Sequence, residues 1–153
     1  MATTSSKDGF SNPFNLNRFI QAQEKIYDRV LAELRNGRKQ SHWMWYIFPQ
    51  IDGLARSATS KYYAIKSREE AIAYMNHHVL GKRLFECANT VLVIEGKTVL
   101  EIFGYPDNLK FKSSMTLFSA IAKDSLFINV LDKYFQSEQD NRTLQLLGNI
   151  NKY

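Results

Sequence analysis

The spacing of the apolar residues constrains this chain most, because they recur at intervals of three and four over most of its length. Such spacing places apolar side chains on one face of an α-helix. The first run follows Asn15, a residue type that caps helices, and stops before Gly37, a residue type that ends them. It predicts one helix over residues 15–36. Gln23 is the only polar residue that interrupts the apolar stripe of this helix.

Further helices follow, several of them opened by capping signals. The segments Ser67–Glu70 and Thr98–Glu101 each have the capping-box pattern, in which a hydroxyl and a carboxylate satisfy the first free amides of a helix. We predict a short helix or turn over residues 59–65, and helices over residues 67–76, 79–94, 98–103, 108–122, 126–136 and after Asp140. The expected caps of the helices at 108 and 126 are Asp107 and Ser125.

The pattern as a whole favours an all-α fold. Only Trp43–Ile47 could also be a strand, and we predict a short helix there because Pro49 forces the preceding residue out of helical geometry. Helices of unequal length favour a compact, single-domain orthogonal bundle of five to seven helices over residues 14–150, after a flexible tail over residues 1–13. The residues expected in its core are Leu16, Phe19, Ile20, Tyr27, Leu31, Leu84, Val91, Leu117, Phe118 and Leu131.

Composition excludes several classes of protein. The 153 residues suit one domain, and no apolar run approaches the ~20 residues of a membrane span. One cysteine, Cys87, excludes an internal disulfide framework, and its place on an apolar helix face predicts an inert buried thiol. The first ten residues lack the apolar core of a secretory signal, so we expect a cytoplasmic protein.

The net charge of +5 suits anionic partners, although a basic surface that only keeps the protein soluble would give the same value. No run of five basic residues occurs, so we do not expect nucleic acid as the main partner. We expect no cofactor and no metal, because the adjacent His77 and His78 would diverge by about 100° on a helix and no HExxH motif occurs.

The segment Ser41–Gln50 is the first candidate for chemistry, because it holds both tryptophans of the chain. Its aromatic residues form either core or a ligand platform. His42 has an ordinary pKa of ~6.5 and is therefore either a general base or a hydrogen-bonded structural histidine. Gln23 has the same two alternatives, since a buried amide bonds nearby backbone or reaches into a pocket.

The segment Ile102–Thr116 is the second candidate. Lys110 falls in the first turn of a predicted helix, where its charge opposes the helix dipole by a few tenths of a kcal/mol. An anion bound nearby would make this arrangement favourable, with Ser113 close to the same line along the helix. The alternative is an exposed lysine that tolerates the small penalty.

Several further motifs are distributed along the chain: Phe14-Asn15-Leu16, Arg18-Phe19, Ala22-Gln23, Ser41-His42-Trp43-Met44-Trp45, Phe48-Pro49-Gln50, Tyr63-Ala64-Ile65, Leu80-Gly81-Lys82-Arg83-Leu84, and Ile102-Phe103-Gly104 with Asp107, Lys110 and Ser113 to Phe118. Together they resemble the domain-of-unknown-function 1810 family, over about residues 14–147. The resemblance implies a mostly helical single domain found mainly in bacteria, with no established activity. Some members are labelled calpastatin, which does not suit a chain with core-forming periodicity throughout, because calpastatin-type inhibitors are disordered.

If the two segments meet in space, they form one pocket for a planar anionic ligand such as a nucleotide or an ADP-ribose derivative. His42 and Asp107 would then be its catalytic residues, and the reaction would be hydrolysis of a glycosidic or nucleotide bond. The alternatives are a non-catalytic protein-interaction module and, less favoured, an RNA-binding domain. The residues expected to bind the ligand are Gln23, Trp45, Gln50, Lys110 and Ser113.

Overall fold

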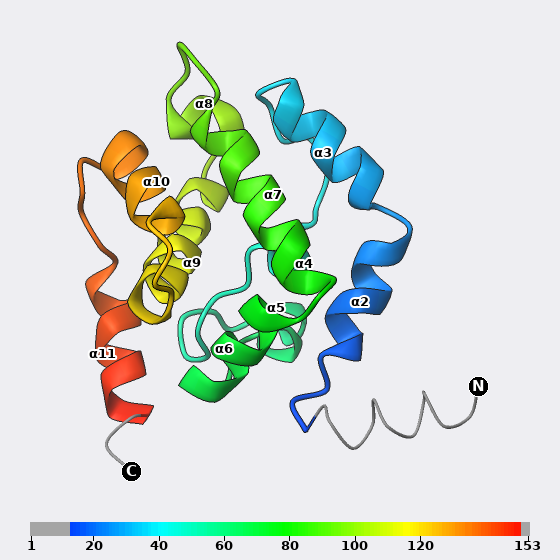
Figure 1. Ribbon diagram of the computed structural model, residues 1–153, viewed down its shortest axis with the longest axis vertical. Helices are drawn as coiled ribbons and strands as arrows, with labels where there is room; N and C mark the ends of the chain where they lie inside the picture. Colours follow the sequence, from blue (N-terminus) through cyan, green and yellow to red (C-terminus); the bar gives the residue numbers. More distant parts are fainter. Residues whose placement is uncertain (1–12, 151–153) are drawn as a thin grey trace.

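The computed structural model describes residues 13–150, with side chains to residue 148, and over this range the chain forms ten helices and no strand (Figure 1). The predicted all-α fold class is confirmed. Three helices of only four or five residues bring the number above the five to seven expected. The helices are α2 (Asn17–Glu24), α3 (Tyr27–Arg35), α4 (Met44–Ile47), α5 (Ala58–Tyr62), α6 (Arg68–Asn76), α7 (Leu80–Leu92), α8 (Val99–Phe103), α9 (Asp107–Ile121), α10 (Leu126–Phe135) and α11 (Asn141–Ile150).

The single helix predicted over residues 15–36 is wrong, because the chain breaks into α2 and α3 at Lys25 and Ile26. The apolar stripe continues across the break, so periodicity gave no sign of it. Tertiary packing explains the division: α2 packs against α4, whereas α3 packs along α7. The predicted flexible tail lies outside the described residues except for Pro13.

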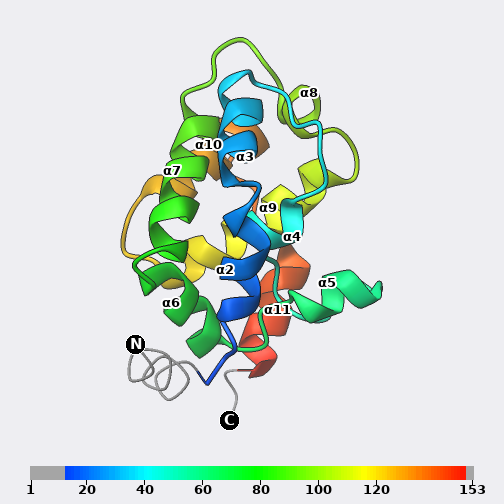
Figure 2. The ribbon, with the colours of Figure 1, turned by 90° about the vertical axis from the view of Figure 1, so that its right-hand side faces the viewer.

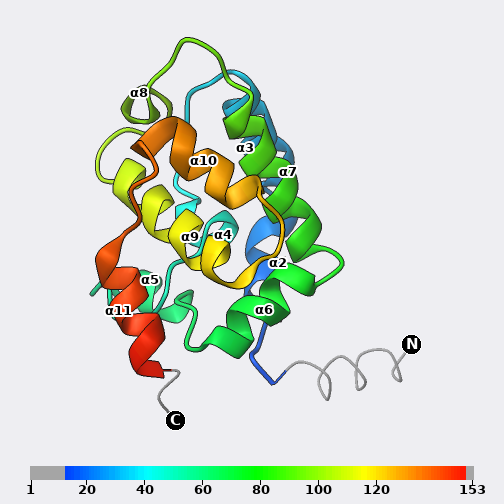
Figure 3. The same ribbon diagram turned by 60° about the vertical axis from the view of Figure 1, so that its left-hand side comes forward.

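Two helices form the centre of the molecule. α9 contacts α4, α6, α8, α10 and α11, and every residue from 113 to 118 is buried, including hydroxyl-bearing ones. α7 packs against α3, α4, α6 and α10. Figure 3 shows α10 lying across α9, and α11 also packs against α9. These contacts bury the middle of α9 and leave its first turn, residues 107–110, partly exposed.

The one-turn helix α4 sits among α2, α7 and α9, and it confirms the short helix predicted before Pro49. A helix this short leaves its last carbonyl groups without intrahelical partners. The amide of Gln23 donates to the carbonyl of Tyr46 at 2.7 Å, and the hydroxyl of Tyr74 contacts the carbonyls of Tyr46 and Ile47 at 3.0 and 3.2 Å. Side chains of α2 and α6 therefore end α4 and fix its orientation.

The predicted caps have mixed outcomes. Thr98 and Glu101 form the full capping box, and Asp140 accepts a hydrogen bond from the backbone of Thr143 as a cap should. Asn15 does not cap a helix, because it has a positive φ of 54° and α2 begins only at Asn17. Asp107 lies inside the first turn of α9.

Two further capping predictions differ in detail. Ser67 accepts from the amide of Glu70, but the Glu70 carboxylate bonds the amide of Lys66 instead of that of Ser67. Ser125 makes no side-chain cap on α10; the carboxylate of Asp124 accepts from the first amide instead. In both cases the residue one position earlier in the chain takes the predicted role.

The predicted core is largely correct. Eight of the ten residues are buried, while Ile20 and Tyr27 are half-buried against the same core. None of the helices in the described range is long and apolar enough to cross a membrane.

Candidate functional site

The loop between α3 and α4 is held by the carboxylate of Glu33. This side chain accepts hydrogen bonds from the amides of Gln40 and Ser41 at 2.8 and 3.1 Å, from the Ser41 hydroxyl, and from Nε1 of Trp43 at 2.9 Å. Burial alone would raise the pKa of Glu33, but these hydrogen bonds outweigh it and lower the pKa to about 2. Glu33 was not among the predicted residues. The signal for it was its position three residues after the buried Val30, which places the carboxylate on the same helix face.

Lys39, from this loop, meets α9 and α4 in what we call the lysine–tryptophan cluster: Lys39, Trp45, Asp107 and Lys110. Nζ of Lys39 lies 2.7 Å from Oδ2 of Asp107, and Nζ of Lys110 lies 3.5 Å from Oδ1 of the same carboxylate. Nζ of Lys110 also lies 4.9 Å from the centroid of the Trp45 ring system. The structure thus brings together residues from the two predicted segments.

The cluster carries an excess positive charge and, among the described residues, an unpaired hydrogen-bond donor. Two ammonium groups share one carboxylate, so one positive charge is left over. The side chain of Lys39 is 6% exposed and that of Lys110 is 24% exposed, so Lys110 is the one that solvent reaches. Nε1 of Trp45 is buried and has no hydrogen-bond partner among the described residues, and a buried donor without an acceptor is costly.

Gln50 lies near Trp45, because both line a small cavity that also touches the core residue Ile51. Its accessible volume is about 10 Å³, room for roughly one water molecule. The other lining residues are Ile51, Gly53, Leu54, Ala55, Ser60, Tyr63 and Ala64.

Ser113 turns away from the cluster. Its hydroxyl contacts the carbonyl of Leu109 at 3.1 Å and Oδ2 of Asp140 at 3.2 Å, which ties α9 to the start of α11. Asp140 also accepts from the amide of Thr143. Ser113 is therefore occupied in joining two helices.

Gln23 is fully buried, and both ends of its amide have protein partners. It donates to Tyr46 and to the Tyr74 hydroxyl, and it accepts from Nη1 of Arg83 at 3.1 Å. Of its two predicted roles, the bonding of nearby backbone is the one observed. Gln23 therefore serves the core and does not belong to the candidate site.

His42 is exposed, and it has no hydrogen bond or ion pair with the residues that the structure describes. It stands three residues from Lys39 and three from Trp45, so its Cα lies within about 11 Å of theirs. Asp107, the other predicted catalytic residue, holds both lysines of the cluster.

The other chemically interesting residues serve the fold. Cys87 is buried, and burial raises the pKa of its thiol to about 12, which keeps it protonated. The predicted divergence of His77 and His78 is wrong, because both lie beyond the end of α6 and their rings stack with centroids 4.8 Å apart. Within residues 13–150, no group of three or more His, Cys, Asp and Glu side chains is placed to hold a metal ion.

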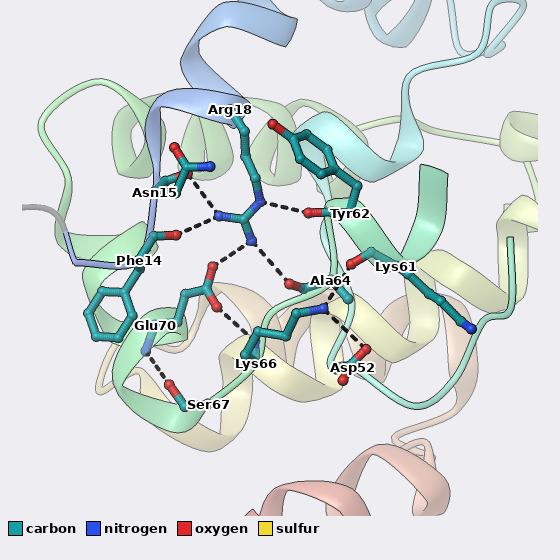
Figure 4. Close-up of polar contacts among 10 residues, drawn as sticks. All are labelled: Phe14, Asn15, Arg18, Asp52, Lys61, Tyr62, Ala64, Lys66, Ser67 and Glu70. Atoms are coloured by element: carbon teal, nitrogen blue, oxygen red, sulfur yellow. Dashed lines mark hydrogen bonds and ion pairs between the residues drawn. The ribbon is translucent and has the colours of Figure 1, made fainter. Parts of the chain in front are cut away.

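A buried ion pair between Arg18 and Glu70 was not predicted (Figure 4). Nη2 of Arg18 lies 2.6 Å from Oε2 of Glu70, and the guanidinium also donates to four backbone carbonyls. All five N–H groups are thereby satisfied, so this arginine joins α2, α5 and α6 and has none left for a ligand. Tyr62, Ala64 and Glu70 lie 44–52 residues from Arg18 in the sequence, so no local pattern could identify them as its partners.

Comparisons with known proteins identify a family and a similar solved structure, and none of them names an activity. A crystal structure of the conserved hypothetical protein Rv1873 from Mycobacterium tuberculosis superimposes with a TM-score of 0.88, at 47% identity, covering 89% of this chain and 98% of that one. No curated protein matches. The family model described as "Protein of unknown function (DUF1810)" matches residues 13–147. The chain therefore belongs to the DUF1810 family.

Proposed function

We propose that this protein binds a small anionic, nucleotide-like molecule, such as an ADP-ribose derivative, at the lysine–tryptophan cluster. The observation that carries this proposal is the Lys110 ammonium, which lies 4.9 Å from the Trp45 ring centroid. Among the described residues, Asp107 is its one carboxylate partner, and Lys110 shares it with Lys39. One uncompensated cation beside an indole is a combination that suits a phosphate attached to a planar base.

The chemistry of each group fits a part of such a ligand. Lys110 has a flexible stem, so its ammonium can leave the Trp45 ring for a phosphate and remain near Asp107. The exposed part of the indole then stacks on the base. The N–H of Trp45 has no acceptor among the described residues. An acceptor atom of the ligand, or a water that bridges to it, would supply this partner.

Hydrolysis of a glycosidic or nucleotide bond is the reaction that we propose to test at this site. Asp107 lies within the cluster, and His42 stands three residues from both Lys39 and Trp45 in the chain. Incubation with ADP-ribose and AMP, followed by chromatography of the products, measures this directly. Product formation that Asp107→Asn and His42→Ala both abolish supports an enzyme, whereas binding without turnover supports a binding protein.

Calorimetric titration with ADP-ribose and AMP tests the binding itself. Lys110→Ala should weaken binding by ~1.5–3 kcal/mol, about 10- to 150-fold, the range for a hydrogen bond to a charged group. Lys112→Ala is the matched control, because Lys112 is on the same helix but pairs with Glu138. Equal effects of the two variants, or no binding by the wild type, would contradict the proposal.

A further inference from the structure

A groove separate from the cluster runs between the start of α3 and the first turns of α7. Its volume is about 420 Å³, within the range of small-molecule sites. The views in Figures 1 and 2 agree that α3 and α7 lie side by side. It includes two residues of the Leu80–Leu84 motif that the proposed function does not use. The lining residues are Tyr27, His78, Val79, Lys82, Arg83 and Glu86.

Gly81 sets the position of the two basic residues in this groove. A Cβ at Gly81 would lie 1.9 Å from the carbonyl oxygen of Met75, a distance that no side chain tolerates. Only glycine therefore lets the first turn of α7 pack directly on the end of α6. The two residues that follow, Lys82 and Arg83, are held in place by this contact.

Contacts with the protein hold Arg83 in the groove but occupy only part of its guanidinium. Its guanidinium lies 4.7 Å from the centroid of the Tyr27 ring, and Nη1 donates to the buried Gln23 at 3.1 Å. Its other N–H groups have no acceptor in the part of the chain that the structure describes. A guanidinium that is already held and still has free donors is prepared for the oxygens of a phosphate.

The charges around Arg83 favour an anion. Lys82 is exposed, and neither Lys82 nor Arg83 has a carboxylate within ion-pair distance over the described range. Both lie in the first turn of α7, which has no acidic residue, so their charges oppose the helix dipole unless an anion is bound. The one carboxylate of the lining, Glu86, accepts a hydrogen bond from the Tyr27 hydroxyl.

We propose that this groove is a second binding site, specific for a sugar phosphate. Arg83 and Lys82 bind the phosphate group, and Glu86 accepts hydrogen bonds from the hydroxyl groups of the sugar. A carboxylate one turn from two cations disfavours a bare phosphate ion, whereas a phosphate ester of a polyol satisfies both kinds of group. The site is independent of the proposed function, because it shares no residue with the lysine–tryptophan cluster.

Titration of the ¹⁵N-labelled protein with ribose 5-phosphate tests the proposal, with amide shifts expected between residues 78 and 86. Lys82→Gln should weaken binding at least about fivefold and Arg83→Lys at least about tenfold, since the second loses the guanidinium fork. Lys82→Gln keeps the test valid if Arg83 variants unfold, because Lys82 has no protein partner among the described residues. Arg29→Gln, an exposed arginine on α3 outside the lining, is the control.

The inference would be overturned by the absence of shifts in this segment, by unchanged affinity in Lys82→Gln and Arg83→Lys, or by tighter binding of inorganic phosphate than of ribose 5-phosphate. Glu86→Gln should reduce the preference for ribose 5-phosphate over inorganic phosphate. Lys110→Ala separates the two sites. If that variant removes the binding and Lys82→Gln does not, the phosphate binds at the cluster and the groove is not a site.

Discussion

Glu33 is the residue on which the geometry of the candidate site depends most. The residue is 8% exposed, and its carboxylate accepts hydrogen bonds from both ends of the segment Gln40–Trp43. Lys39 precedes this segment and His42 lies within it. A carboxylate that binds so many donors stabilises the fold only while it is ionised.

The pKa of Glu33 predicts how stability depends on pH. The pKa is lowered to about 2 in the folded protein from an ordinary value near 4.5, so the folded state favours the ionised form. The resulting stabilisation, up to about 3 kcal/mol, is fully present above pH 4.5 and is lost as the pH falls towards 2. Urea unfolding across this range measures it.

Glu33→Gln should lower the free energy of unfolding at pH 7 by about 2–4 kcal/mol, because the amide NH₂ group faces donors that have lost their acceptor. The variant should also lose part of the decline between pH 4.5 and 2. Glu24→Gln, at an exposed position on α2, is the control and should change neither quantity. A Glu33→Gln protein as stable as the wild type would show that the carboxylate does not hold the loop.

At the scale of elements, α4 depends on side chains from other helices. It is too short to be stable alone, and Gln23 and Tyr74 satisfy the carbonyls at its end. Tyr74 is fully buried and also makes an edge contact with the Phe19 ring at a centroid distance of 4.9 Å. These contacts fix the helix that carries Trp45.

Tyr74→Phe should therefore lower the free energy of unfolding by about 1–3 kcal/mol, since Gln23 and the carbonyls of α4 lose a partner while the ring packing remains. Chemical denaturation gives this value. Tryptophan fluorescence of the folded variant should also shift, because Trp45 is one of only two tryptophans. Tyr62→Phe is the matched control, at an exposed tyrosine. An unchanged spectrum together with unchanged stability would mean that α4 does not need this cap.

At the scale of the whole molecule, α7 and α9 organise one hydrophobic core that α3 helps to close. Leu31, on α3, is 7% exposed and belongs to that core. Lys39 and Asp107, distant in the sequence, can meet only because this packing brings the α3–α4 loop to the start of α9.

Leu31→Ala should reduce the free energy of unfolding by ~2–5 kcal/mol through lost apolar burial and the cavity left behind. Denaturation followed by far-UV circular dichroism measures this, and the same spectra should be strongly helical for both proteins. Ile128→Ala, at a half-exposed position on α10, is a control that should cost much less. A loss below about 1 kcal/mol for Leu31→Ala would contradict the assignment of this helix face to the core.

The sequence by itself determined the helices and most of the core, because apolar periodicity and capping boxes such as Thr98–Glu101 act over one or two turns. It also identified Trp45, Asp107 and Lys110 as residues of interest from their types and local positions. Tertiary structure alone decided that α2 and α3 separate and that Gln23 serves α4. The same holds for the pairing of Arg18 with Glu70 and for the sharing of one carboxylate by two lysines. Those contacts join residues distant in the sequence, and a side chain's partner across such a distance depends on how whole helices pack.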